Sequence, residues 1–252
     1  MVSDEEFNRL DVSAWKVTSH IPESSNGALL VEQGAYRGVY KAVAQENPLW
    51  DFPESTLTLR EHQAFLIDRH LNFNLIPATM WVEDAGYGPG IIQRFIEDAS
   101  TPDIRLIGAD VDSDEWITIL KGEIEDEEVF LQHNAASDIY EAAVFDVLIN
   151  NSDRKAGHLL RDTRNKLWLI DHGVCFHTQD KLRTILWGWI GSSLAEPIRQ
   201  RLESGLQHRR WRNDWLLSDM ELRAFESRIS KLLEFGMPEP QSGWPALPSP
   251  LF

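Results

Sequence analysis

The segment from Ile149 to Gly173, INNSDRKAGHLLRDTRNKLWLIDHG, constrains the fold of this 252-residue chain more than any other. It continues from residues 138–149 (DIYEAAVFDVLI), whose mostly apolar character predicts a buried helix. A polar loop follows, and then two short strand-like runs, HLLR and KLWLI, joined at the turn DTRN. Because a hairpin returns the chain close to its starting point, we expect Asp153 before it and Asp171 after it to face one pocket.

The side chains of this segment are the types that phosphoryl transfer requires. One carboxylate orients the acceptor hydroxyl and takes its proton, while a second carboxylate and a neutral ligand hold a divalent cation against the nucleotide phosphates. Asp153, His158 and Asp171 supply these groups. Taken alone, Asp153–Arg154 is compatible with a loop ion pair, and Asp171–His172–Gly173 with a turn after a strand. Their combination behind a buried helix favours a functional site.

The rest of the chain divides into a β-rich first part and a helical second part. Strands are predicted at residues 14–20, 28–32, 38–44, 78–83 and 90–96, and helices at 57–71, 195–206 and 218–234. Ser55 is the expected N-cap of the first of these helices. The last segment carries five of the twelve prolines, which predicts an extended tail. The pattern indicates an α+β fold with two lobes.

Composition limits the location and the partners. The net charge of −16 repels nucleic acid and anionic membrane surfaces, so neither is an expected partner. No apolar run reaches the roughly 18 residues of a membrane span, and the acidic N-terminus has no apolar signal region. The single cysteine, Cys175, excludes an internal disulfide framework, and we expect a cytoplasmic protein. The basic stretch 181–212 is either a solvated face or a surface for an acidic or phosphorylated acceptor.

The loops SDRKAGH and IDHG resemble the catalytic and metal-binding loops of the phosphatidylinositol 3-/4-kinase-like branch of the protein-kinase superfamily, in the layout shared by HipA-type bacterial kinases. That family has an Asp-Arg catalytic loop, an Asn five residues after the Asp, and an Ile-Asp-Phe-Gly-type loop after a short hairpin. Through VYKAVAQENPLWDFP and DHGVCFHTQDKLRTILWGW the chain also resembles an actinobacterial family with this signature. The resemblance covers residues 14 to 235.

The resemblance implies a two-lobed, protein-kinase-like fold with an N-lobe at 1–97, a C-lobe at 98–236 and a Pro-rich tail at 237–252. It implies a kinase that uses ATP with Mg²⁺ or Mn²⁺ and transfers the γ-phosphate to a protein or small-molecule hydroxyl. A lipid acceptor is disfavoured by the acidity of the chain. Asp153 and Arg154 would form the catalytic loop, and Asp171 and His158 would hold the metal.

The resemblance also assigns the nucleotide site. Lys41 would contact the phosphates and Glu61 would pair with it. A phosphate-covering turn would be formed by Ser24, Ser25 and Asn26, and a hinge against adenine by residues 93–96, including Gln93 and Phe95.

Two departures from the family leave other functions open. His158 stands where the family has Asn, and its imidazole suits manganese better than magnesium. Lys155 stands where lipid kinases often have His. A nucleotide-binding pseudokinase is therefore one alternative. A metal-dependent phosphohydrolase is another, with His172 and His177 as additional ligands.

Overall fold

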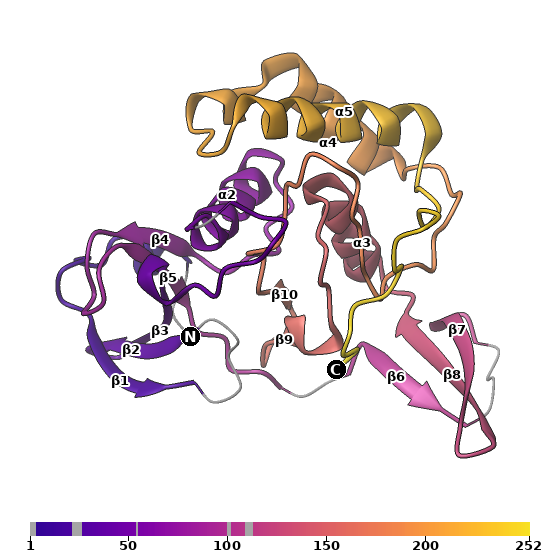
Figure 1. Ribbon diagram of the computed structural model, residues 1–252, viewed down its shortest axis with the longest axis horizontal. Helices are drawn as coiled ribbons and strands as arrows, with labels where there is room; N and C mark the ends of the chain where they lie inside the picture. Colours follow the sequence, from indigo (N-terminus) through magenta and orange to yellow (C-terminus); the bar gives the residue numbers. More distant parts are fainter. Residues whose placement is uncertain (1–3, 22–26, 54, 100–101, 109–112) are drawn as a thin grey trace.

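The computed structural model describes residues 4–21, 27–53, 55–99, 102–108 and 113–252. A β-rich N-terminal part lies at the left of Figure 1, and a largely helical C-terminal part occupies the centre and top. The predicted α+β class, with a β-rich first part and a helical second part, is confirmed.

The N-terminal part is built on a five-stranded antiparallel sheet of order β1-β2-β3-β5-β4. Its strands are β1 (Lys16–His20), β2 (Leu29–Gln33), β3 (Tyr36–Ala42), β4 (Thr79–Val82) and β5 (Gly90–Arg94). Along β3, Gly38, Tyr40 and Ala42 are buried, and the residues between them are less buried. This period of two places Lys41 on the face opposite Tyr40. The short helix α1 (Asp4–Phe7) adds Phe7 to the core on the Tyr40 side.

Helix α2 (Leu57–His70) lies between the sheet and the helical part (Figure 1). The prediction that Ser55 caps it is wrong, because Ser55 has φ 59° and the N-cap is Thr56. The carboxylate of Glu46 performs the capping instead, since it accepts hydrogen bonds from Leu57 N at 3.0 Å and Thr58 N at 2.7 Å.

As far as the structure describes it, the C-terminal part contains three main helices, a hairpin and two 3₁₀ turns. These elements are α3 (Ser137–Ile149), η2 (Ala156–His158), β9 (Leu159–Arg161), β10 (Leu167–Leu169), α4 (Glu196–His208), η3 (Arg210–Asn213) and α5 (Asp219–Phe235). A further 3₁₀ turn, η1 (Val43–Gln45), follows β3 in the N-terminal part. Helix α3 is buried along most of its length and lies in the middle of the larger hydrophobic core. Helix α5 starts with a capping box in which Glu221 accepts from Ser218 N at 2.9 Å.

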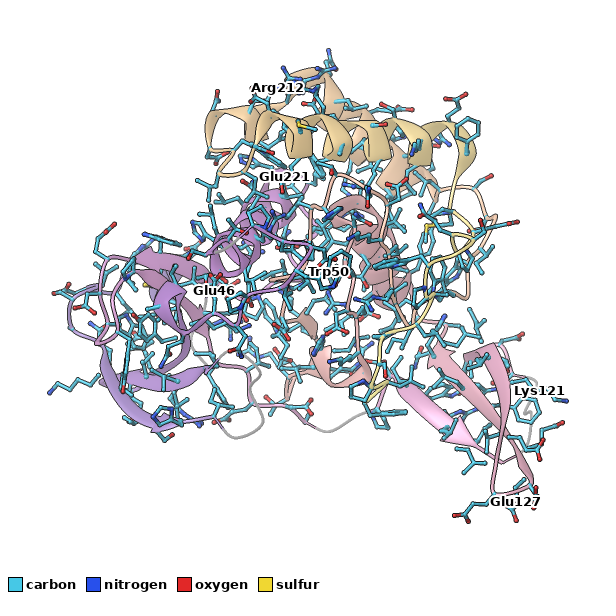
Figure 2. The ribbon with its side chains drawn as sticks, viewed as in Figure 1. Glu46, Trp50, Lys121, Glu127, Arg212 and Glu221 are labelled. Atoms are coloured by element: carbon cyan, nitrogen blue, oxygen red, sulfur yellow. The ribbon has the colours of Figure 1, made fainter. Side chains whose placement is uncertain are left out.

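The acidic segment, for which the sequence suggested no element, forms a separate three-stranded sheet. Strands β6 (Ile104–Ile107), β7 (Trp116–Ile124) and β8 (Glu127–Asn134) pair in the order β6-β8-β7. Lys121 and Glu127 lie at its outer end, away from the helices (Figure 2). Most of β7 is exposed, so its charged residues are solvated.

The Pro-rich C-terminal segment has no helix or strand but is packed against the domain. Ala156 N donates to Leu251 O at 2.9 Å, and Thr184 N donates to Ala246 O at 3.1 Å. Leu247 and Leu251 contact the larger core. Within the part of the chain that the structure describes, no helix combines the length and apolar character needed to cross a membrane.

Candidate active site

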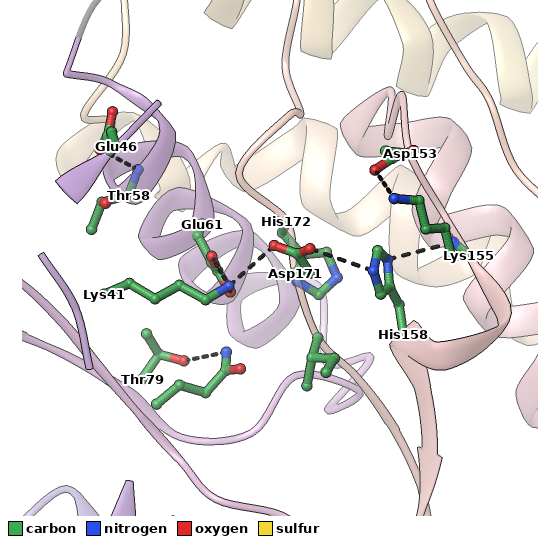
Figure 3. Close-up of polar contacts among 12 residues, drawn as sticks. Lys41, Glu46, Thr58, Glu61, Thr79, Asp153, Lys155, His158, Asp171 and His172 are labelled. Atoms are coloured by element: carbon green, nitrogen blue, oxygen red, sulfur yellow. Dashed lines mark hydrogen bonds and ion pairs between the residues drawn. The ribbon is translucent and has the colours of Figure 1, made fainter. Parts of the chain in front are cut away.

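Lys41 is the centre of the polar cluster where the sheet, α2 and the loop after β10 meet (Figure 3). Its Nζ lies 2.7 Å from Glu61 Oε2 and 3.1 Å from Asp171 Oδ1. Burial alone would lower the pKa of Lys41, but the charges of Asp171 and Glu61 outweigh it and raise that pKa. The lysine therefore remains a fixed cation between two acids that lie 110 positions apart in the sequence.

Asp171 follows β10 with φ 62°, a left-handed conformation that turns its side chain toward Lys41. The ammonium of Lys41 holds the pKa of Asp171 well below its usual range, although burial opposes this. Asp171 is thus an anion at neutral pH. Its second oxygen, Oδ2, lies 3.4 Å from His158 Nε2.

His158 ends η2 and stays neutral, because burial lowers its pKa to about 4. The backbone N–H of Lys155 donates to His158 Nδ1 at 3.4 Å, so the ring proton resides on Nε2 and faces Asp171. A metal on Nε2 would require the other tautomer.

The donor set at this position fits a nucleotide-bound cation. Mg²⁺ in kinase-type sites takes one or two protein carboxylates and completes its shell with phosphates and water. Asp171 offers an ionised carboxylate, and His158 offers a second ligand next to it after the tautomer changes. Across the described ranges, no group of three or more His, Cys, Asp or Glu side chains is arranged to hold a metal by itself.

Asp153 lies on the other side of His158, in the loop after α3 (Figure 3). Its Oδ2 is 3.0 Å from Lys155 Nζ, and its backbone N–H is fixed by Asn151 Oδ1 at 3.0 Å. Burial raises the pKa of Asp153, against the effect of Lys155. Asp153, Lys155, His158, Asp171, Lys41 and Glu61 therefore form one continuous series of contacts, and the single pocket expected for Asp153 and Asp171 stays a prediction.

Arg154 does not face this cluster. It is fully buried, and its guanidinium binds both oxygens of Asp146 at 3.0–3.1 Å, Ile170 O at 2.9 Å and His172 Nε2 at 2.8 Å. Arg154 thereby ties the Asp153 loop to α3 and to the Asp171 loop, as a positioning residue. Asp146 was not among the residues predicted from the sequence, although an acid within the apolar run AAVFDVLI is a signal for a buried ion pair.

The proposed hinge residues Gln93 and Phe95 form no hydrogen bond or ion pair with this cluster in the described part of the chain. Gln93 is buried, and its Nε2 donates to Thr79 Oγ1 at 3.0 Å. Phe95 instead packs beside Arg37, with Cζ 4.1 Å from the ring centroid, and lines a cavity of about 350 Å³ that includes none of the cluster residues. The predicted turn of Ser24, Ser25 and Asn26 lies outside the described residues.

Among the described residues, His172 and His177 do not join a metal centre. His172 is fully buried against Arg154, and His177 Nδ1 accepts from Gln179 N at 3.0 Å. Cys175 is also buried, and burial raises the pKa of its thiol. Their positions give the phosphohydrolase alternative no additional ligand beside Asp171.

Fold and site together define an α+β protein whose two parts meet at a cluster of a strand lysine, a helix glutamate and a loop aspartate. No family model matches the chain. The chain belongs to the family of Protein Rv2133c of Mycobacterium tuberculosis, to which it is 36% identical over 212 residues, with 78% of this chain and 76% of the relative covered. A weak structural similarity, with a TM-score of 0.44 and 10% identity, links 88% of the chain to 93% of the Helicobacter pylori proinflammatory kinase CtkA.

Proposed function

We propose that the protein is an ATP-dependent phosphotransferase that transfers the γ-phosphate to a hydroxyl acceptor with the help of Mg²⁺ or Mn²⁺. One observation carries the proposal: Lys41 pairs with Glu61 on a helix and with Asp171 after a hairpin at the same time. Kinases require a β3 lysine paired with a helix glutamate, together with a metal-binding aspartate. We assign residues 1–97 to the N-lobe, 98–236 to the C-lobe and 237–252 to the tail.

Each residue of the cluster has a role in this proposal. Lys41 contacts the nucleotide phosphates, and Glu61 fixes the direction of its ammonium. Asp171 and His158 hold the cation, which when bound neutralises charge on the phosphates. Asp153 accepts the proton of the acceptor hydroxyl. Its raised pKa makes it a stronger base than a free carboxylate.

The test combines transfer and binding measurements on the same variants. With γ-labelled ATP and either metal, Asp153→Asn should lose phosphoryl transfer and keep the nucleotide-induced thermal shift. Asp126→Asn is the matched control, because Asp126 is exposed at the β7–β8 turn and has φ 66°, which Asn tolerates. Transfer that persists in Asp153→Asn refutes the assignment of the base. Rapid release of free phosphate without an acceptor would favour a hydrolase.

A second candidate is nucleotide binding without transfer. It is favoured by the proton on His158 Nε2, which points at Asp171 instead of leaving a lone pair for the cation. A nucleotide-induced thermal shift without transfer to any acceptor, in both the wild type and His158→Asn, would support this candidate.

A further inference from the structure

Arg183 is fixed directly beside the loop that carries Asp153. Its backbone N–H donates to Asn151 O at 3.0 Å, and its carbonyl accepts from Arg154 N at 3.0 Å. A parallel bridge pairs Arg154 with Thr184. The segment that carries Arg183 is thus bonded to the chain on both sides of Asp153.

The side chain of Arg183 is held as well. Its Nε donates to Ser152 O at 2.6 Å, and its Cζ lies 5.3 Å from the ring centroid of Trp244. Trp244 is itself anchored, because its Nε1 donates to Lys181 O at 3.1 Å. These contacts fix the plane of a half-buried guanidinium, so little side-chain entropy is lost when it binds a ligand.

The two η nitrogens of Arg183 have no hydrogen-bond or ion-pair partner among the residues described. The buried arginines of the chain differ in this respect, since each is neutralised by an acid. Among the described residues, those pairs are Arg60 with Glu221, Arg94 with Asp4, Arg154 with Asp146, Arg161 with Asp103, and Arg228 with Asp180. Arg183 lies close enough to Asp153 for its charge to lower the pKa of that carboxyl group, but it forms no ion pair with it among the described residues. In a chain of net charge −16, a guanidinium with both η nitrogens unpaired beside the proposed base indicates an anionic ligand.

We propose, on the basis of the proposed function, that Arg183 binds a carboxylate or phosphate group of the acceptor and thereby places the acceptor hydroxyl at Asp153. The free η nitrogens form the fork that matches two oxygens of such a group. The acceptor oxygen then bonds to the γ-phosphorus as the bond from that phosphorus to the β–γ bridging oxygen breaks. ADP leaves, and Asp153 takes the hydroxyl proton.

The experiment compares acidic and neutral acceptors in two series, which separate a peptide source of the anion from a small-molecule source. One series contains serine peptides of equal length flanked by Glu or by Ala, and the other contains glycerol 3-phosphate and glycerol. The wild type should prefer the acidic member of at least one series. In Arg183→Gln the KM for that member should rise about 10- to 100-fold, the range for loss of a charge-assisted contact. Arg183→Lys should recover only part of the loss, because lysine lacks the fork.

Control variants test whether the preference for acidic acceptors comes from Arg183 itself or from a general loss of positive charge or packing. Arg210→Gln removes an exposed cation that has no ion-pair partner among the described residues, and it should leave the acceptor preference unchanged. Trp244→Leu should weaken the preference less than Arg183→Gln does. Binding of inorganic phosphate to the ATP-analogue complex, measured by calorimetry, should be weaker for Arg183→Gln than for the wild type, which tests the subsite without turnover.

Three results overturn the inference. Equal use of acidic and neutral acceptors by the wild type is one, and equal phosphate binding by the wild type and Arg183→Gln is another. A reduced nucleotide-induced thermal shift in Arg183→Gln would assign the arginine to the nucleotide instead. Absence of that shift in the wild type would contradict the proposed function itself, and the inference would fail with it.

Discussion

Removing the carboxylate of Asp146 should destabilise the protein more than almost any other single substitution. Asp146 and Arg154 are both fully buried, and the carboxylate also accepts from Asn151 Nδ2 at 3.0 Å and Thr184 Oγ1 at 3.1 Å. Asp146→Ala leaves the guanidinium of Arg154 charged in the core without its acid. Loss of one partner of a buried pair costs about 3–5 kcal/mol, which lowers Tm by roughly 6–20 °C in a chain of this size.

Urea unfolding followed by tryptophan fluorescence measures this loss. The double variant Asp146→Leu with Arg154→Met removes both charges, so it should be more stable than Asp146→Ala. Lys121→Met is the matched control, because it breaks the exposed pair with Glu128 and should change the free energy of unfolding little. The reasoning is refuted if Asp146→Ala costs less than about 1 kcal/mol, or if the double variant is the less stable of the two.

Three further predictions concern charge and protonation. Lys41→Met should weaken nucleotide binding and raise the pKa of Asp171, measured by NMR titration, because the cation that depresses that pKa is gone. His158→Asn should shift the metal preference from Mn²⁺ toward Mg²⁺ in transfer assays, since an amide oxygen suits the harder ion; an unchanged preference would exclude His158 as a ligand. Burial lowers the pKa of His133 to about 4, and its Nε2 accepts from Gly188 N at 3.0 Å. Below pH ~6.5, His133 therefore binds a proton in the unfolded state but not in the native state. The free energy of unfolding should fall by up to roughly 3 kcal/mol between pH 6.5 and 4. In His133→Gln that fall in the unfolding free energy should be smaller by this contribution.

The elements around the site could be predicted because local patterns determine them. The helix expected at 138–149 is α3 at Ser137–Ile149, and the runs HLLR and KLWLI form the hairpin β9–β10. Lys41 and Glu61 were found through family resemblance, since nothing local indicates that a strand and a helix 20 positions apart form an ion pair.

Two features escaped prediction for different reasons. Strand β7 pairs with β8 across a two-residue turn, but its mostly exposed side chains show no alternation of burial along most of its length. Arg183 lies within a basic stretch that the sequence leaves open between a solvated face and a binding surface. Only its bonds to the backbone of the Asp153 loop, and its stacking on Trp244 from the far end of the chain, distinguish it from its neighbours.

The position of Glu61 is determined by how α2 is attached to the helical part. Arg60, the residue before it, is buried, with Nη2 2.5 Å from Glu221 Oε1 and Nη1 2.8 Å from Cys175 O. One turn further on, Gln63 Oε1 accepts from Leu216 N at 2.7 Å. A swing of α2 that separated Glu61 from Lys41 would have to expose the buried Arg60 pair, which is strongly unfavourable. Under the proposed function, Glu61 is therefore held in place independently of the nucleotide. Control of the proposed activity is accordingly expected on the acceptor side, where Arg183 and the C-terminal segment meet the Asp153 loop, and not through movement of this helix.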